Sequence, residues 1–208
     1  GQHFKRKIKA TNLINIDIDS GVNESEFIYC DITDYNQLES LKLSQYEEIT
    51  IILLAAVHFD FQKNYFKTNV DGTNNVLKYM SLNSNVKKFV FFSSVATYGE
   101  SFLGKCENSD QIPINDYGKS KLIAEKNIID WHELNKSIQT IIVRPAVVFG
   151  EYNFGNVFNL VMQIQSGYFA VIGGGMNIKS IAYAGNLVDS VLFTLKNVNK
   201  TFFVYNYS

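Results

Sequence analysis

Short, almost uninterrupted runs of apolar residues recur along the chain. Five of them have the length and composition of strands: residues 12–18 (NLINIDI), 27–32 (FIYCDI), 49–56 (ITIILLAA), 89–94 (FVFFSS) and 138–143 (IQTIIV). These runs do not alternate between apolar and polar residues, as a half-exposed strand does. They are typical of strands that are covered on both faces of a parallel sheet.

Two longer segments between the later strands have helical spacing instead. Residues 70–82 and 117–134 carry apolar side chains three and four positions apart. Strands that alternate with helices in this way are typical of βαβ units. The pattern therefore predicts an α/β fold with an open, doubly wound parallel sheet of the Rossmann type.

Composition and charge narrow the possible partners. The 208 residues are 46% hydrophobic and 19% charged, with a net charge of -1, which is ordinary for a globular protein. The lysines are scattered, so we expect no nucleic-acid partner. The longest apolar run, Ile49 to Val57, is far below the roughly 20 residues of a membrane-spanning helix, so we expect no membrane insertion.

The cysteines and the first residues add expectations about location. Cys30 and Cys106 are too few and too far apart for a metal site or a disulfide framework. The opening GQHFKRKIKA has no apolar core of the kind that a signal peptide needs. We therefore predict a cytoplasmic protein without a metal.

A tyrosine and a lysine four residues apart form the first candidate for chemistry. In NDYGKSKLIAEK, Tyr117 and Lys121 share a helix face that continues through Ala124, Ile128 and Trp131 toward the sheet. A tyrosine that acts as a base near pH 7 needs its pKa lowered by about three units, or about 4 kcal/mol. A close ammonium in a desolvated cleft supplies much of this. In a chain with 12 tyrosines such a spacing also arises by chance about once.

The strand ending in FVFFSS supplies a second candidate. Ser93 and Ser94 lie at its carboxyl end, where ligands bind in open α/β sheets, so Ser94 is placed to hydrogen-bond a substrate hydroxyl. The alternative is that both serines satisfy backbone groups where the strand turns. The strand alone leaves the two readings open.

Five motifs in order point to one family. LAAVHFD, NVDGTNNVL, FFSSVATYG, DYGKSK and VRPAVVFGE together resemble the extended short-chain dehydrogenase/reductase family, in particular its NAD-dependent sugar-nucleotide epimerases and dehydratases. The resemblance extends over essentially the whole chain and includes the terminal FFVYNYS. It implies a catalytic triad of Ser94, Tyr117 and Lys121, with Lys121 binding the nicotinamide ribose and lowering the pKa of Tyr117. It also implies that Asn69 braces the active site from a neighbouring helix; the alternative is a polar residue that caps or bends that helix.

The resemblance also implies NAD as the cofactor. Asp17 matches the acidic residue that accepts hydrogen bonds from the adenosine ribose and repels a 2′-phosphate, with Asp19 as a rival. Further matches to cofactor-binding positions are Gly1, Asp31, Ile32, Ala55 and Ala56. Gly1 matches the last glycine of the family's glycine turn. The resemblance then implies that the first strand, two glycines and much of the C-terminal part are missing from this sequence.

On the same resemblance, residues 1–150 form the NAD-binding domain and residues 151–208 part of a substrate-binding region interwoven with it. Lys179 falls where many relatives place an arginine that binds the nucleotide diphosphate, although a lysine lacks the bidentate fork and a solvated side chain is the alternative. Val147 stands where epimerases often carry an asparagine that binds substrate. We therefore expect a nucleotide-sugar substrate with altered contacts.

Among the family's reactions, the residues favour epimerisation. The 4,6-dehydratases need an acid–base pair directly after the triad hydroxyl residue, and here those positions are Val95 and Ala96. The leading hypothesis is a sugar-nucleotide 4-epimerase of polysaccharide biosynthesis, in which Tyr117 takes a hydroxyl proton and NAD takes and returns the hydride. The alternatives are a keto-sugar reductase or dehydrogenase with the same triad and a non-catalytic nucleotide-binding relative. A homodimer through the Tyr117 helix is a further expectation from the resemblance.

Overall fold

The computed structural model describes residues 1–8, 13–19, 27–57, 64–101, 104–151, 153–171 and 174–208. Its central sheet has four parallel strands in the order β3-β4-β5-β8, namely β3 (Ile49–Leu53), β4 (Val86–Phe92), β5 (Gln139–Pro145) and β8 (Phe202–Tyr207). Two further parallel pairs are β1 (Asn15–Asp17) with β2 (Phe27–Tyr29) and β6 (Val147–Phe149) with β7 (Ile181–Tyr183). All strand pairs in this part of the chain are thus parallel, as predicted.

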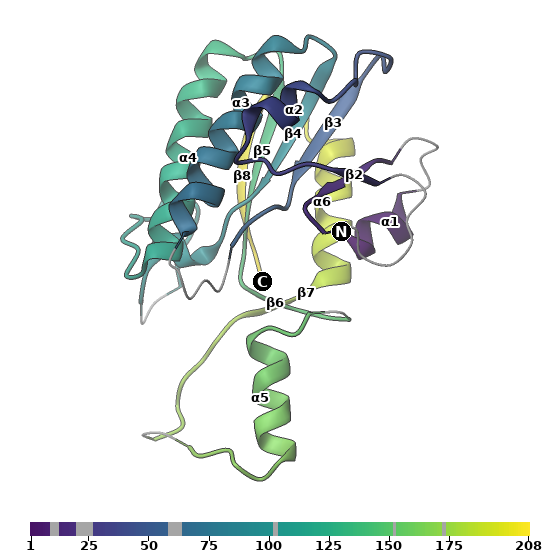
Figure 1. Cartoon of the computed structure of the whole chain (residues 1–208). Helices are drawn as coiled ribbons and strands as arrows, with labels where there is room; N and C mark the ends of the chain where they lie inside the picture. The colour runs from purple at the N-terminus through teal and green to yellow at the C-terminus, as the bar shows by residue number, and fades with distance from the viewer. Residues whose placement is uncertain (9–12, 20–26, 58–63, 102–103, 152, 172–173) are drawn as a thin grey trace.

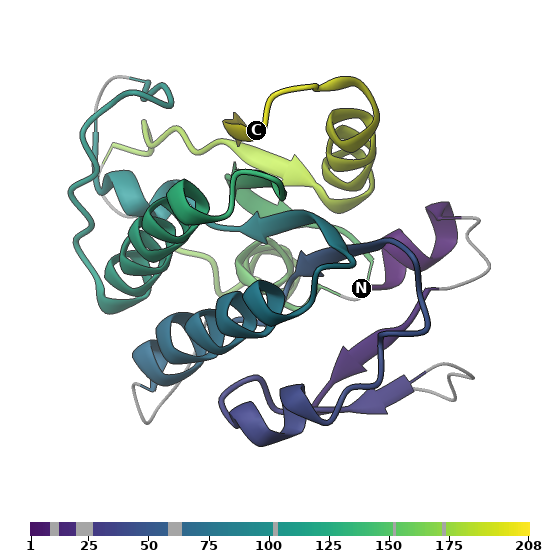
Figure 2. The same cartoon turned by 90° about the horizontal axis from the view of Figure 1, so that it is seen from above.

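Helices cover both faces of the central sheet, as Figures 1 and 2 show. On one face lie α3 (Thr73–Leu82) and α4 (Asp116–Leu134), and on the other lie α1 (Gln2–Lys7) and α6 (Ala184–Asn197). A short α2 (Tyr35–Glu39) packs against α3, and α5 (Asn156–Gln165) extends away from the sheet. The predicted doubly wound α/β fold is confirmed.

The core divides into two layers because successive residues of a strand point to opposite faces. Phe89 and Phe91 of β4 pack with the apolar residues of α3 and α4. Val90, between them, packs with Leu187 and Val191 of α6 on the other face. All three β4 side chains are at most 1% exposed, which explains why this strand is apolar without alternation.

The ends of the predicted elements differ from the observed ones for local reasons. A π-helical turn, Lys67–Gly72, overlaps the start of the predicted helix 70–82. The α-helical part therefore begins only at Thr73. The strand predicted for 27–32 ends at Tyr29, because Asp31 and Asp34 form the turn that leads into α2. Asn12 of the first predicted strand lies outside the described residues.

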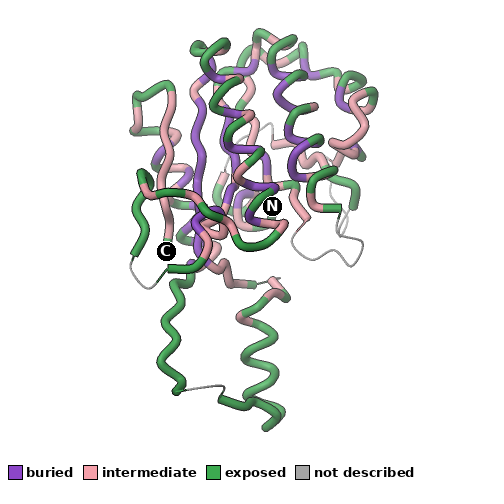
Figure 3. Tube along the Cα trace, turned by 90° about the vertical axis from the view of Figure 1, so that its left-hand side faces the viewer, coloured by how far each residue is buried: buried purple, intermediate pink, exposed green. Residues whose placement is uncertain are grey.

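Residues after β6 form an arm that stands clear of the sheet. No residue of α5 is buried, and Figure 3 shows the arm exposed along its length. The chain then returns to the main body, where α6 and β8 complete the central layers. The domain boundary at residue 150 and the interweaving of the two regions stay predictions. Among the helices that the structure describes, none combines the length and the apolar character needed to cross a membrane.

Candidate active site

Tyr117 lies in the first turn of α4, and two local features fix that turn. The Asn115 side chain caps the helix by accepting a hydrogen bond from the Gly118 amide at 2.8 Å. Gly118 is needed because α4 approaches the 3-10 turn Val95–Tyr98 very closely: a Cβ at this position would lie 2.5 Å from the Ala96 carbonyl oxygen. The glycine thereby brings the Tyr117 end of the helix against the turn that begins at Ser94.

Ser94 belongs both to that turn and to the Tyr117 environment. Its Oγ accepts a hydrogen bond from the Ala96 amide at 3.1 Å, and its carbonyl accepts one from the Thr97 hydroxyl at 3.0 Å. It also forms a side-chain hydrogen bond with Tyr117. The two readings of the sequence are therefore compatible, since Ser94 satisfies a backbone group and contacts the candidate acid/base.

The pKa of Tyr117 differs from the expectation. Burial raises the pKa of the phenol above its ordinary value, and the hydrogen bond with Ser94 opposes this only in part. The Lys121 ammonium instead donates to the Phe92 carbonyl at 2.8 Å and lies 4.8 Å from the centre of the Phe91 ring. Lys121 thus does not lower the pKa of Tyr117 in this arrangement, because its charge is held at the end of β4.

Lys121 is almost fully buried, with 2% of the residue exposed. Burial lowers its pKa from 10.5 to about 7, and the Glu125 carboxylate on the same helix opposes this shift. An amine with this pKa is close to half protonated near neutral pH. A small change in its surroundings therefore changes the charge next to Tyr117.

Asn69 is buried in the π-helical turn and joins three segments. Its Oδ1 accepts from the Val57 amide at 2.9 Å, and its Nδ2 donates to the Val57 carbonyl at 3.2 Å and to the Ser120 hydroxyl at 2.9 Å. The contacts run from the chain after β3 to α4, so the geometry agrees with a bracing residue. Ser120 was not predicted as a site residue, although it lies between Tyr117 and Lys121.

Apart from Gly1, the candidate cofactor residues lie at the end of β1 or just after β2 and β3. Asp17 and Ala55 are exposed, and Ala56 is half-buried. Ile32 is held by the Asn75 amide, which donates to its carbonyl at 2.9 Å, and Asp31 accepts from the Thr33 amide at 2.8 Å. An exposed carboxylate and small side chains at strand ends suit the ribose and the flat rings of a dinucleotide, so these residues fit NAD. Their individual roles stay predictions.

The outlying candidates are less closely placed. Gly1 is exposed at the start of α1, and no atom outside its chain neighbours lies within 4 Å of where its Cβ would be. Lys179 is exposed on the segment that leads into β7. Val147 begins β6 and Asp19 follows β1. The structure therefore gathers Ser94, Asn69, Tyr117 and Lys121 around the start of α4, and it leaves the diphosphate contact of Lys179 a prediction.

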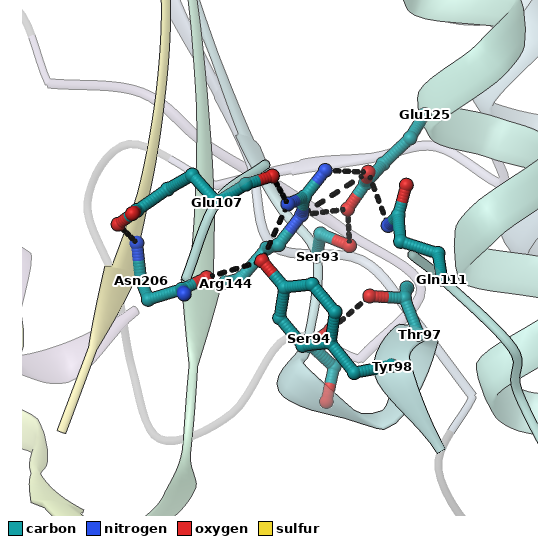
Figure 4. Close-up of polar contacts among 9 residues, drawn as sticks. All are labelled: Ser93, Ser94, Thr97, Tyr98, Glu107, Gln111, Glu125, Arg144 and Asn206. Carbon is teal, nitrogen blue, oxygen red and sulfur yellow. Dashed lines mark hydrogen bonds and ion pairs between the residues drawn. The ribbon is translucent and has the colours of Figure 1, made fainter. Parts of the chain in front are cut away.

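A buried ion pair beside this group was not predicted from the sequence. Glu125 of α4 and Arg144 of β5 form hydrogen bonds with each other and with Ser93 and Tyr98, which flank the Ser94 turn (Figure 4). The available signals were an acidic residue four positions after Lys121 and an arginine directly after a strand that was predicted to be buried. Neither identifies the partner.

Comparisons with known proteins point to the same family as the sequence motifs. The model of the NAD dependent epimerase/dehydratase family matches residues 1–206. The N-acetyl-alpha-D-glucosaminyl-diphospho-ditrans,octacis-undecaprenol 4-epimerase of Escherichia coli O157:H7 is 45% identical over 162 residues, which are 76% of this chain and 49% of that protein. The UDP-glucose 4-epimerase of Vibrio cholerae is 26% identical over 211 residues, covering 95% of this chain and 64% of that protein. The chain thus spans about half to two thirds of the length of these relatives.

A solved structure extends the likeness to the fold. The UDP-glucose 4-epimerase of Brucella ovis, in complex with NAD, aligns with a TM-score of 0.73 at 24% sequence identity. The alignment covers 91% of this chain and 66% of that one. At this identity the likeness concerns the fold alone.

Proposed function

The chain belongs to the NAD dependent epimerase/dehydratase family, and we propose that it carries the catalytic residues of an NAD-dependent 4-epimerase that acts on a diphosphate-linked sugar. The observation that carries the proposal is the close packing of the start of α4, which holds Tyr117, against the turn that Ser94 caps, with Lys121 one helical turn further along α4. A hydroxyl pair of this kind can hold a sugar hydroxyl and exchange its proton.

Each residue of the group has a role in the proposed reaction that fits its position. Tyr117 removes the proton of the reacting hydroxyl and later returns it, while Ser94 holds the reacting oxygen by a hydrogen bond. Lys121, when protonated, stabilises the phenolate of Tyr117 by its charge. Asp17, Asp31, Ile32, Ala55 and Ala56 hold NAD, which when bound supplies hydride acceptance and hydride return.

Tyr117 needs a lower pKa than burial gives it in order to act as a base near neutral pH. Lys121 is the group placed to provide this, if its ammonium turns from the Phe92 carbonyl toward the phenol. We propose that binding of the cofactor ribose accompanies this change.

The positions after Ser94 argue against a dehydratase. Val95 and Ala96 form the start of the 3-10 turn and carry no group that can protonate a leaving hydroxyl or remove a carbon-bound proton. A reductase that uses the same triad is the second candidate, since the residues named so far serve both reactions.

The substrate class follows from what the two named relatives share. One relative is named for a sugar diphosphate linked to undecaprenol and the other for UDP-glucose. Both names contain a hexose joined to a diphosphate, and they differ in the group on its other side. We propose that the site takes the sugar diphosphate, and that the higher identity to the first relative, 45% against 26%, favours the polyprenyl-linked form.

The test uses the protein at its full natural length with NAD. It is incubated with GlcNAc-diphospho-undecaprenol in detergent or with UDP-GlcNAc, and the ratio of the 4-epimers is followed by NMR together with nicotinamide absorbance. An epimerase converts either pure epimer to the same mixture with no net change in NADH. Stoichiometric consumption of NADH or NAD would favour the reductase. Conversion of UDP-GlcNAc alone would contradict the polyprenyl-linked preference.

A further inference from the structure

A buried ion pair joins α4 to β5 next to the candidate active site. The Arg144 guanidinium donates to the Glu125 carboxylate through Nη2 at 2.6 Å and through Nε at 2.9 Å. The two side chains are only 5% and 1% exposed. Removing two charges from water costs about as much as their attraction returns, so a buried pair is weak evidence for a stabilising role. Its contacts indicate another role.

The pair holds the turn that contains Ser94 at two points, as Figure 4 shows. On one side the Ser93 hydroxyl donates to Glu125 Oε1. On the other side Arg144 Nη1 donates to the Tyr98 hydroxyl at 2.6 Å. Ser94 lies between these two anchored residues, so the ion pair restrains its backbone from both directions.

The same carboxylate also restrains the other half of the catalytic contact. Glu125 lies on α4, one turn beyond Lys121 and two turns beyond Tyr117. The loop before α4 is attached too, because the Gln111 amide donates to Glu125 Oε2 at 3.0 Å. A displacement of α4 relative to the Ser94 turn would therefore stretch these contacts.

The network continues from Tyr98 to the last strand of the sheet. The Tyr98 hydroxyl donates to Asn206 Oδ1 of β8 at 2.8 Å, and the backbone N–H of Asn206 donates to Glu107 Oε1 at 2.7 Å. The Glu107 carbonyl in turn accepts from Arg144 Nη1 at 3.1 Å. Every group in this circuit has a partner, which makes the arrangement rigid and specific.

We infer that the Glu125–Arg144 pair, through its hydrogen bonds to Ser93 and Tyr98, positions Ser94 against Tyr117 for proton exchange. Glu125 and Arg144 are 1% and 4% exposed, so they act through Ser93 and Tyr98 and do not touch substrate. Small misplacements of reacting groups lower turnover strongly, which gives such positioning a measurable effect. The inference rests on the proposed function for its kinetic test.

The variant that tests it is Tyr98→Phe, and the matched control is Tyr205→Phe. Both remove one phenolic hydroxyl; that of Tyr205 pairs with Ser190 at 3.2 Å on the α6 side of the sheet. In Tyr98→Phe, Arg144 Nη1 keeps the Glu107 carbonyl, so the change is mild. We expect kcat to fall about tenfold while KM changes less than about twofold, and we expect the control to keep both within about twofold.

A second readout does not depend on turnover. The hydrogen bond with Ser94 lowers the pKa of Tyr117, so loosening the Ser94 turn raises it. Titration of [13Cζ]tyrosine-labelled protein by NMR is therefore expected to show a higher Tyr117 pKa in Tyr98→Phe and Ser93→Ala than in the unaltered protein and in Tyr205→Phe. If the unaltered protein shows no epimerase activity, the proposed function fails while this titration still tests the inference.

The contrary outcomes are equally definite. An unchanged Tyr117 pKa in both Tyr98→Phe and Ser93→Ala would overturn the inference, whatever their activity. So would equal loss of kcat in Tyr98→Phe and Tyr205→Phe at equal loss of thermal stability, since the effect would then be general destabilisation. Thermal unfolding of all variants is measured alongside to separate these cases.

Discussion

The Asn69 amide donates to the hydroxyl of Ser120 at 2.9 Å, which ties the π-helical turn before α3 to α4 between Tyr117 and Lys121. Ser120 in turn donates to the Tyr117 carbonyl at 2.8 Å. Asn69 also pairs with both backbone groups of Val57. One buried amide thus connects the chain after β3, where the cofactor is proposed to bind, with the helix that carries the proposed acid/base.

Replacing this amide is expected to destabilise the protein. Asn69→Ala leaves the Val57 amide and the Val57 carbonyl without their side-chain partner, while the Ser120 hydroxyl keeps only its bond to the Tyr117 carbonyl. Each unsatisfied buried group costs about 1–3 kcal/mol. We expect the free energy of unfolding to fall by about 2–4 kcal/mol. Urea denaturation measures it, and Asn74→Ala, at an exposed position of α3, is the control with a change within about 0.5 kcal/mol. A loss of no more than about 0.5 kcal/mol, as in the control, would contradict the bracing role.

Tyr117→Phe tests the proposed acid/base directly. The change removes the hydroxyl that exchanges the substrate proton but keeps the ring, so turnover is expected to fall about a hundredfold to ten-thousandfold with the fold intact. Epimer conversion by the protein at its natural length measures the first quantity and circular dichroism the second. Tyr79→Phe, on the buried side of α3 away from this turn, serves as the control. Retention of full turnover by Tyr117→Phe would contradict the catalytic role.

The buried Lys121 predicts a specific dependence of stability on pH. Burial lowers its pKa to about 7 in the folded chain, while in the unfolded chain it returns to 10.5. Between these values the unfolded state binds more protons, so this residue makes stability rise with pH from about 7 upward. Comparing urea denaturation of the unaltered protein and Lys121→Met at pH 7, 8 and about 9 isolates the effect. The difference is expected to move in favour of the unaltered protein, and a constant difference would refute the assignment.

Gly118 is expected to tolerate no side chain. In Gly118→Ala the new methyl group would meet the Ala96 carbonyl oxygen at 2.5 Å, so α4 must move away from the Ser94 turn. The cost of such overpacking is about 1–3 kcal/mol, which exceeds the gain in helix propensity of about 1 kcal/mol. We expect a lower melting temperature together with lower turnover. Gly104→Ala, with no atom within 4 Å of the added group, is expected to change neither.

Much of the fold was predictable because burial on both faces leaves a local signature. The apolar runs at 49–56, 89–94 and 138–143 overlap β3, β4 and β5 with shifted ends, and the helical spacing of 117–134 coincides with α4 to within one residue. The strands β6 and β7 were not predicted, because three residues of half-exposed sequence carry too little periodicity. The π-helical turn before α3 was missed for a similar reason: its residues fit a helical pattern, and only the hydrogen bonds distinguish it.

The candidate site, like the fold, was predictable from the sequence only in part. Tyr117, Lys121 and Ser94 were predicted from two short motifs, residues 91–99 and 116–121, and the structure brings these residues together. Glu125 and Arg144 are 19 residues apart, and Tyr98 and Asn206 are 108 apart, so no spacing in the sequence indicates that they meet. The sequence also could not predict where the Lys121 ammonium points, because its acceptor, the Phe92 carbonyl, lies on a different element.

The sequence by itself determined the parallel α/β sheet, the helix that carries Tyr117 and Lys121, and the family, because strand burial, helical periodicity and short motifs are all local properties of the chain. Only the tertiary structure decided the charge at Lys121, the raised pKa of Tyr117 and the network that holds Ser94 in place. These depend on desolvation and on hydrogen bonds between distant segments, and such quantities are defined only once the chain has folded.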